Sequence, residues 1–214
     1  MRSDMERLLL LAGIAIALLL SAIHPHDLAT WAMETAPIFI AAPLLIATHR
    51  RFPLSPLLAA LIVLHALVLL VGGHYTYAEV PLGYWLQEMF GLSRNPYDRI
   101  GHFFQGLVPA LAAREILLRN GFVTGQRMVC FLAVCVAMAV SASYELIEWA
   151  AALILGQGAD QFLGTQGDPW DTQWDMFMAL TGSSMAMLFL PRLHDRSINS
   201  LSSNRHQSSP RESA

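Results

Sequence analysis

Three pairs of ionisable side chains stand at helical spacing in segments that are otherwise apolar: Asp98 and His102, Glu145 and Glu148, and Asp171 and Asp175. Residues three or four positions apart share one face of a helix, so each pair presents two polar groups side by side. A charge at the centre of a bilayer costs about 2.5–3.5 kcal/mol on insertion scales, and such residues are rare unless they are paired or used. These six residues therefore form the candidate functional site.

The types of these side chains suit two kinds of chemistry. Carboxylates are ligands for Mg²⁺, Mn²⁺ and Ca²⁺, and an added imidazole extends the set to Zn²⁺. The hypothetical ligands of such a divalent metal are Asp98, His102, Glu145, Glu148, Asp171 and Asp175. General acid–base catalysis needs no metal, because imidazole titrates near neutral pH and clustered carboxylates provide both an acid and a base. The candidate catalytic residues are His102, Asp98, Glu145 and Glu148.

The composition places these residues in a membrane protein. Of the 214 residues, 55% are hydrophobic and 14% are charged, whereas soluble domains carry about a quarter charged residues. The net charge of −3 provides no basic surface for a nucleic acid. We therefore expect the lipid bilayer, and no nucleic acid, as the partner of this chain.

Six apolar segments are predicted to span the membrane, which gives an all-α, polytopic transmembrane helix bundle. Their approximate ranges are 8–23, 31–48, 54–71, 99–118, 128–155 and 171–190. The first is expected to be retained, because no small-x-small cleavage site follows it. The last contains small residues at Ala179, Gly182 and Ala186, a spacing that favours close helix packing.

Three further segments lie outside the predicted spans. Within the long connection after the third span, Pro81–Phe90 is predicted to be a short interfacial helix. Asp168 is expected to stand at or near the N-cap of the last span, with Pro169 at the first helical position. Residues 1–196 form the predicted six-span membrane domain, and 197–214, rich in Ser, Asn and Arg, are predicted to be a disordered cytoplasmic tail.

The distribution of arginines predicts the orientation. All 13 basic residues are Arg, and a cytoplasmic N-terminus places eleven of them inside, with only Arg94 and Arg99 outside. This is a strong positive-inside bias, so both termini are expected in the cytoplasm. The acidic pairs and His102 then all come to the periplasmic face, where we expect them to line one pocket.

Three motifs carry a resemblance to a known family. Residues 99–106 (RIGHFFQG), 144–149 (YELIEW) and 162–176 (FLGTQGDPWDTQWDM) resemble the YjdF family of bacterial inner-membrane proteins. The resemblance covers nearly all of the membrane portion and implies a multi-pass protein of the bacterial inner membrane. It implies no particular reaction.

A looser similarity is to VanZ-like proteins. They share the Asp98-x-x-x-His102 pattern, an acidic residue on the next helix at Glu145, and an Asp171-led helix start. This chain has Asp175 where those proteins carry Asn, and Met178 where they carry Gly. The similarity implies handling of glycopeptide-type antibiotics or envelope lipids at the outer leaflet.

These observations favour an integral inner-membrane protein whose periplasmic pocket acts, as a metal-dependent or acid–base enzyme, on a lipid-linked envelope substrate. An ion- or proton-coupled transporter is a second hypothesis, although the chain lacks the internal repeat typical of transporters. A third is a non-catalytic binding or scaffold protein. The polar residues could also serve only as a hydrogen-bonded network that holds three helices in register.

Overall fold

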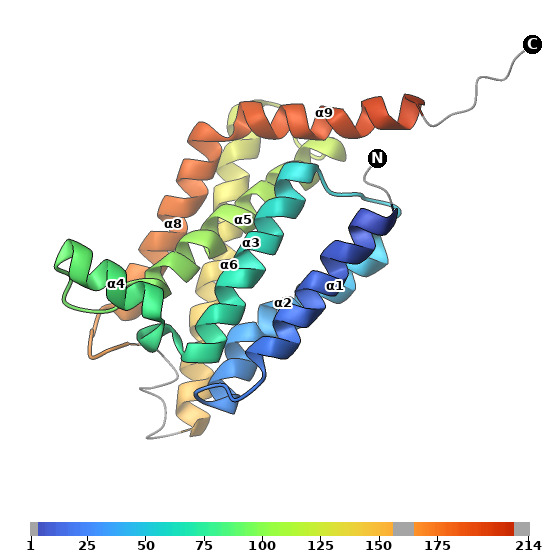
Figure 1. Ribbon diagram of the computed structural model, residues 1–214. Helices are drawn as coiled ribbons and strands as arrows, with labels where there is room; N and C mark the ends of the chain where they lie inside the picture. The colour runs from blue at the N-terminus through green and yellow to red at the C-terminus, as the bar shows by residue number, and fades with distance from the viewer. Residues whose placement is uncertain (1–3, 156–164, 208–214) are drawn as a thin grey trace, which may run out of the picture.

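The computed structural model describes residues 4–155 and 165–207, and within these ranges the fold is entirely helical (Figure 1). The elements are α1 (Asp4–Ser21), α2 (Leu28–Thr48), α3 (Pro56–Tyr75), the 3₁₀ turn η1 (Tyr77–Glu79), α4 (Pro81–Phe90), α5 (Tyr97–Arg119), α6 (Gln126–Leu155), α8 (Asp171–Phe189) and α9 (Pro191–Gln207). The predicted fold class is therefore confirmed as an all-α bundle. The short helix expected at Pro81–Phe90 is α4, with the same bounds.

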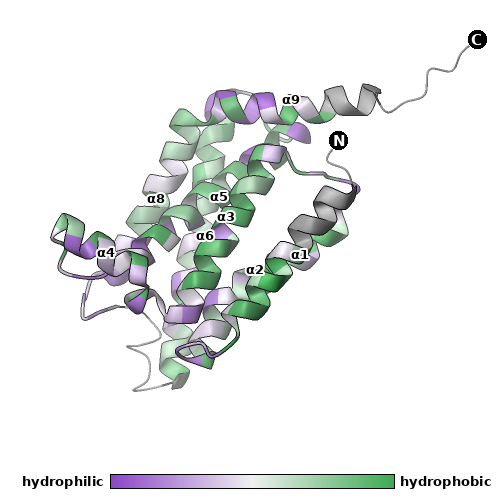
Figure 2. Cartoon of the chain, viewed as in Figure 1, coloured by the Kyte–Doolittle hydropathy of each residue, from purple (hydrophilic) through white to green (hydrophobic). Residues whose placement is uncertain are grey.

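Three of the helices in the described ranges, α2, α3 and α6, are long and apolar enough to cross a membrane. Helices α8 and α9 make a fourth candidate if they are taken as one span bent by 69°. Figure 2 shows the apolar character of α2 and α3 along their length and the polar start of α9. The 23-residue helix α5 is less apolar because its buried face carries charged residues at both ends.

Helix α9 lies across one end of the bundle (Figure 1). It continues to Gln207, so residues 197–207 are helical where the sequence predicted a disordered tail. Contacts from distant parts of the chain explain the difference: Arg114 on α5 binds Asp195 at 2.7 Å, and Leu57 N donates to Ser197 Oγ at 2.9 Å. Residues 208–214 of the predicted tail lie outside the described residues.

Helices α5 and α8 pack backbone against backbone. A Cβ atom built on Gly106 would stand 1.9 Å from the carbonyl oxygen of Ala179, and one on Gly182 would stand 2.0 Å from that of Phe103. Only glycine permits this approach. Since α5 carries Asp98 and His102 and α8 carries the second acidic pair, the two glycines bring the polar residues of both helices together.

The middle of the bundle is apolar. Leu58 of α3, Leu107 and Leu111 of α5, Ala137 of α6 and Met187 of α8 belong to one buried cluster, called here the apolar layer. Its α5 residues lie between His102, near one end of that helix, and Arg114, near the other. The layer therefore separates the polar groups at the two ends of the bundle.

Candidate functional site

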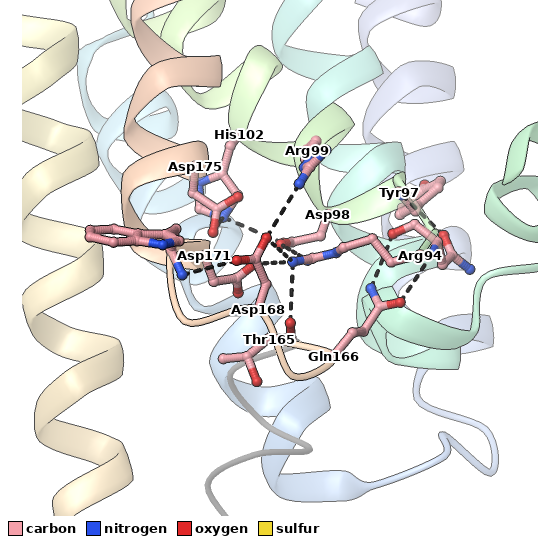
Figure 3. A network of polar contacts seen from close by, with 12 residues as sticks. Arg94, Tyr97, Asp98, Arg99, His102, Thr165, Gln166, Asp168, Asp171 and Asp175 are labelled. Carbon is pink, nitrogen blue, oxygen red and sulfur yellow. Dashed lines mark hydrogen bonds and ion pairs between the residues drawn. The ribbon is translucent and has the colours of Figure 1, made fainter. Parts of the chain in front are cut away.

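Arg94 stands at the centre of the polar network that precedes and begins α5 (Figure 3). Its side chain binds the carboxylate of Asp171, lies 3.4 Å from Asp98 Oδ2, and donates to the backbone oxygen of Thr165 at 3.2 Å. The residue is 8% exposed. Burial opposes its charge, but the hydrogen bond and the negative charge of Asp171 outweigh this and raise the pKa of Arg94 above its ordinary value.

The loop before α8 is fastened to the same place. Gln166 makes two hydrogen bonds of 3.0 Å to the backbone of Asn95. Asp168 Oδ2 lies 3.6 Å from nitrogens of both Arg94 and Arg99. Asp168 was predicted to lie at or near the N-cap of the helix, with Pro169 as its first residue. The N-cap is Trp170, two residues further on, and α8 begins at Asp171. Trp170 N donates to Asp168 Oδ1 at 2.9 Å.

His102 is buried on the inner side of this network. Its Nδ1 lies 2.9 Å from Gln105 Oε1, an oxygen that can only accept a hydrogen bond. Nδ1 therefore carries a proton. The other nitrogen, Nε2, faces two carboxylates, Asp98 Oδ1 at 3.4 Å and Asp175 Oδ2 at 3.8 Å. A nitrogen lone pair and two anionic oxygens repel one another unless a cation, either a proton or a metal ion, lies between them.

The same three residues form a group with the spacing of metal ligands. One ligand atom from each of Asp98, His102 and Asp175 lies within 4.8 Å of the other two, and all three residues are buried. Across the described part of the chain, Asp175 Oδ1 and Glu145 Oε1 are buried without a hydrogen-bond partner. Buried polar atoms are normally satisfied, so these two oxygens mark a place where a ligand would be accommodated.

The six residues expected from the sequence all lie near this end of the bundle, but they differ in their contacts. Asp98, His102 and Asp175 form the compact group, and Glu145 Oε1 lies 3.7 Å from His102 Nδ1. Asp171 instead binds Arg94. Glu148 is half-buried and makes no hydrogen bond or ion pair with the residues that the structure describes.

Sequence reasoning missed two members of the site. Arg94 was noted only as one of two arginines expected outside the cytoplasm. That exception to the positive-inside bias could have marked it as a candidate site residue. Glu34 on α2 is 5% exposed, hydrogen-bonds Tyr77, and lies close enough to interact electrostatically with Asp98 and His102. It is the single acid in the predicted span 31–48, which was a reason to include it.

Comparison with known proteins agrees with the motif resemblance. A family described as "Predicted membrane protein (DUF2238)" matches residues 6–196. "Inner membrane protein YjdF" of Escherichia coli (strain K12) is 60% identical over 185 residues, covering 86% of this chain and 88% of that protein. No solved structure matches the chain.

Proposed function

The chain belongs to the DUF2238 family of predicted membrane proteins and is a multi-pass protein of the inner membrane, and from that premise we propose that it is a cation-dependent enzyme. The proposed cofactor is one divalent metal ion held by Asp98, His102 and Asp175. The proposed substrate is a small lipid-linked molecule of the cell envelope. The single observation that carries the proposal is the convergence of His102 Nε2 and two carboxylates in a buried place.

The proposed topology has six spans, with both termini in the cytoplasm. Support comes from the arginines, eleven of which fall on the side opposite Arg94 and Arg99. Helix α5 then counts as a span in spite of its charges, because it packs against α3, α6 and α8. In this orientation the group of three ligands opens toward the periplasm, where envelope substrates are reached.

The donor set favours a transition metal over Ca²⁺. One imidazole with two carboxylates is a common set for Zn²⁺ and Mn²⁺, whereas Ca²⁺ takes six to eight oxygens. Gln105 would fix the tautomer of His102, as an outer partner does for most metal-binding histidines. When bound, the metal supplies Lewis-acid activation of a phosphoryl or carbonyl oxygen. Glu145, whose Oε1 makes no hydrogen bond with the described residues, would accept or return a proton beside it.

The apolar layer favours an enzyme over the proton-coupled transporter. A proton pathway needs titratable groups or water from one face to the other. Between His102 and Arg114 the buried α5 residues Leu107 and Leu111 belong to one apolar cluster with Leu58 of α3. The only titratable ring beside this cluster among the described residues is that of His65, which stacks on Phe104. The layer thus supports chemistry at one face rather than transfer across the membrane.

Metal analysis of detergent-purified protein tests the proposal. After incubation with Zn²⁺ or Mn²⁺ and desalting, we expect about one metal ion per wild-type chain, since the three ligands are preformed. His102→Ala and Asp175→Asn should each lose it, while Glu148→Gln, a change outside the group of three ligands, should keep it. Size-exclusion profiles show that the variants are folded. Equal metal content in wild type and His102→Ala would overturn the metal site.

The catalytic role is tested separately with a fluorescent lipid phosphate in the same detergent. Glu145→Gln should retain the metal and lose at least about a hundredfold in turnover, the usual contribution of a general acid or base. If the wild-type protein bound metal but turned over no lipid-linked substrate, the proposed enzymatic function would be refuted, and the hypothesis of a binding protein would remain.

A further inference from the structure

A second polar cluster lies at the other end of α5, on the far side of the apolar layer. Glu115, which is fully buried, accepts hydrogen bonds from Ser55 N at 2.9 Å and Ser55 Oγ at 2.6 Å. Arg119 Nη1 donates to the same carboxylate at 2.7 Å. His194 of α9 lies 2.9 Å from its other oxygen. The cluster thus joins the start of α3, the end of α5 and the start of α9.

The geometry of His194 makes this cluster a rigid unit. Its Nδ1 lies 3.1 Å from Arg114 Nη1, and a guanidinium can only donate, so Nδ1 accepts. Nε2 therefore carries the proton and donates to Glu115. Arg114 also donates to Asp195 Oδ1 at 2.7 Å. Two arginines then balance two carboxylates around a neutral histidine, and the side chains at the edge of the cluster are held in place.

An open pocket of about 460 Å³ lies at the surface beside this cluster. Its lining consists of Leu118, Arg119, Asp195, Ile198 and Asn199. Arg119 and Asp195 are thus shared between the cluster and the pocket. Each of the two side chains bonds to the cluster and also lines the pocket.

Both shared residues keep hydrogen-bonding capacity for a ligand. Arg119 uses Nη1 for Glu115 and for Pro53 O, and its Nη2 and Nε make no hydrogen bond with the described residues. Asp195 uses Oδ1 for Arg114, and its side chain is 48% exposed. Leu118 and Arg119 belong to the last turn of α5, whose carbonyl groups Ile116 O, Leu117 O and Leu118 O accept hydrogen bonds from residues 120–122. The pocket therefore offers a cation on one side and an anionic surface on the other.

We infer that this pocket binds a phosphoethanolamine group. Arg119 receives the phosphate, Asp195 receives the ammonium, and Leu118 and Ile198 contact the carbon chain. A ligand with a phosphate alone would place an anion beside Asp195, and a ligand with an ammonium alone would place a cation beside Arg119. Each would meet a like charge in the pocket. This site goes beyond the proposed function, since the apolar layer separates it from His102.

The position of the pocket points to phospholipid as the source of the group. Helix α9 crosses the end of the bundle (Figure 1). The pocket is lined by residues of α9 and of the last turn of α5, and in the proposed topology this end of the bundle meets the cytoplasmic surface of the bilayer. A phosphatidylethanolamine headgroup occurs at that depth. Free phosphoethanolamine has the same chemistry, so the experiment must distinguish the two.

Thermal unfolding of the full-length protein in detergent, with added short-chain lipid, tests the inference. Dihexanoyl phosphatidylethanolamine should raise the melting temperature more than the matching phosphatidylglycerol, which has no ammonium. Asp195→Asn keeps an oxygen for Arg114 but removes the charge, so it should abolish the difference between the two lipids. Glu88→Gln, which neutralises an exposed acid of α4, should leave the difference intact. Ile198→Trp, which fills the pocket, should weaken both responses.

Free phosphoethanolamine is added in a parallel titration. A response to the lipid alone assigns the site to phospholipid, and a response to both shows that the headgroup is sufficient; each supports the inference. Equal responses of the wild type to the two lipids, or an unchanged preference in Asp195→Asn, would overturn it.

Discussion

Replacing Arg94 with Gln is expected to destabilise the protein by about 3–5 kcal/mol, the range for breaking a buried ion pair from one side. Arg94 is the cation between the buried carboxylates of Asp98 and Asp171, with Asp168 3.6 Å away. Glutamine fills much of the same space but carries no charge. The carboxylates would then repel one another in a place that water cannot reach easily. Unfolding in mixed detergent micelles, followed by tryptophan fluorescence, measures the loss.

Arg99→Gln is the matched control for this change. Arg99 is also an arginine at the start of α5, but its side chain is 28% exposed, and it meets Asp168 at 3.6 Å and the ring of Trp174 at 4.9 Å. Pairs of this kind contribute about 0–1 kcal/mol. If Arg94→Gln and Arg99→Gln lowered the free energy of unfolding equally, the expected effect of burying Arg94 would be refuted.

Gly106→Ala should cost about 3 kcal/mol, the upper part of the usual range for overpacking. The new methyl group would meet the backbone oxygen of Ala179 at 1.9 Å, and a backbone atom cannot turn aside as a flexible side chain does. Helices α5 and α8 would have to separate. Since Asp175 lies on α8 and His102 on α5, the same change should also lower metal content. The same unfolding experiment and metal analysis measure both effects.

The identical substitution at Gly13 provides the control. A Cβ atom there would meet nothing within 4 Å, and alanine is a better helix former than glycine. Gly13→Ala should therefore leave stability unchanged or slightly raised. If Gly106→Ala behaved in the same way, the close approach of α5 and α8 would be refuted.

Local patterns in the sequence predicted the helices well. The expected spans 99–118 and 171–190 correspond to the helices α5 (Tyr97–Arg119) and α8 (Asp171–Phe189), and Pro191 follows the end of the second. The small residues Ala179, Gly182 and Ala186 are buried, as their spacing indicated. Helix bounds and the spacing of small residues depend on residues that are close in the sequence, so a single sequence is enough to predict them.

The pairings between distant residues could not be predicted in the same way. Topology placed the acids at one face, but it did not show that Arg94, from a loop, would bind Asp171 on α8. Residues 197–207 have the composition of a disordered tail, and contacts near Arg114 and Leu57 hold them as a helix. Glu115 and His194 escaped notice because they lie 79 residues apart in the sequence and meet only in the folded protein.

The apolar layer also determines where the membrane voltage falls. Most of a transmembrane potential drops across the part of a protein that holds neither water nor charge, at about 2.3 kcal/mol per elementary charge per 100 mV. Here that part lies between His102 and Arg114, and the charged groups stand at its two borders. In the proposed topology, a cation that reached Asp98 and Asp175 from the periplasm would cross little of the field. Its affinity would then be set by the local ligands and would be almost independent of how strongly the cell energises its membrane.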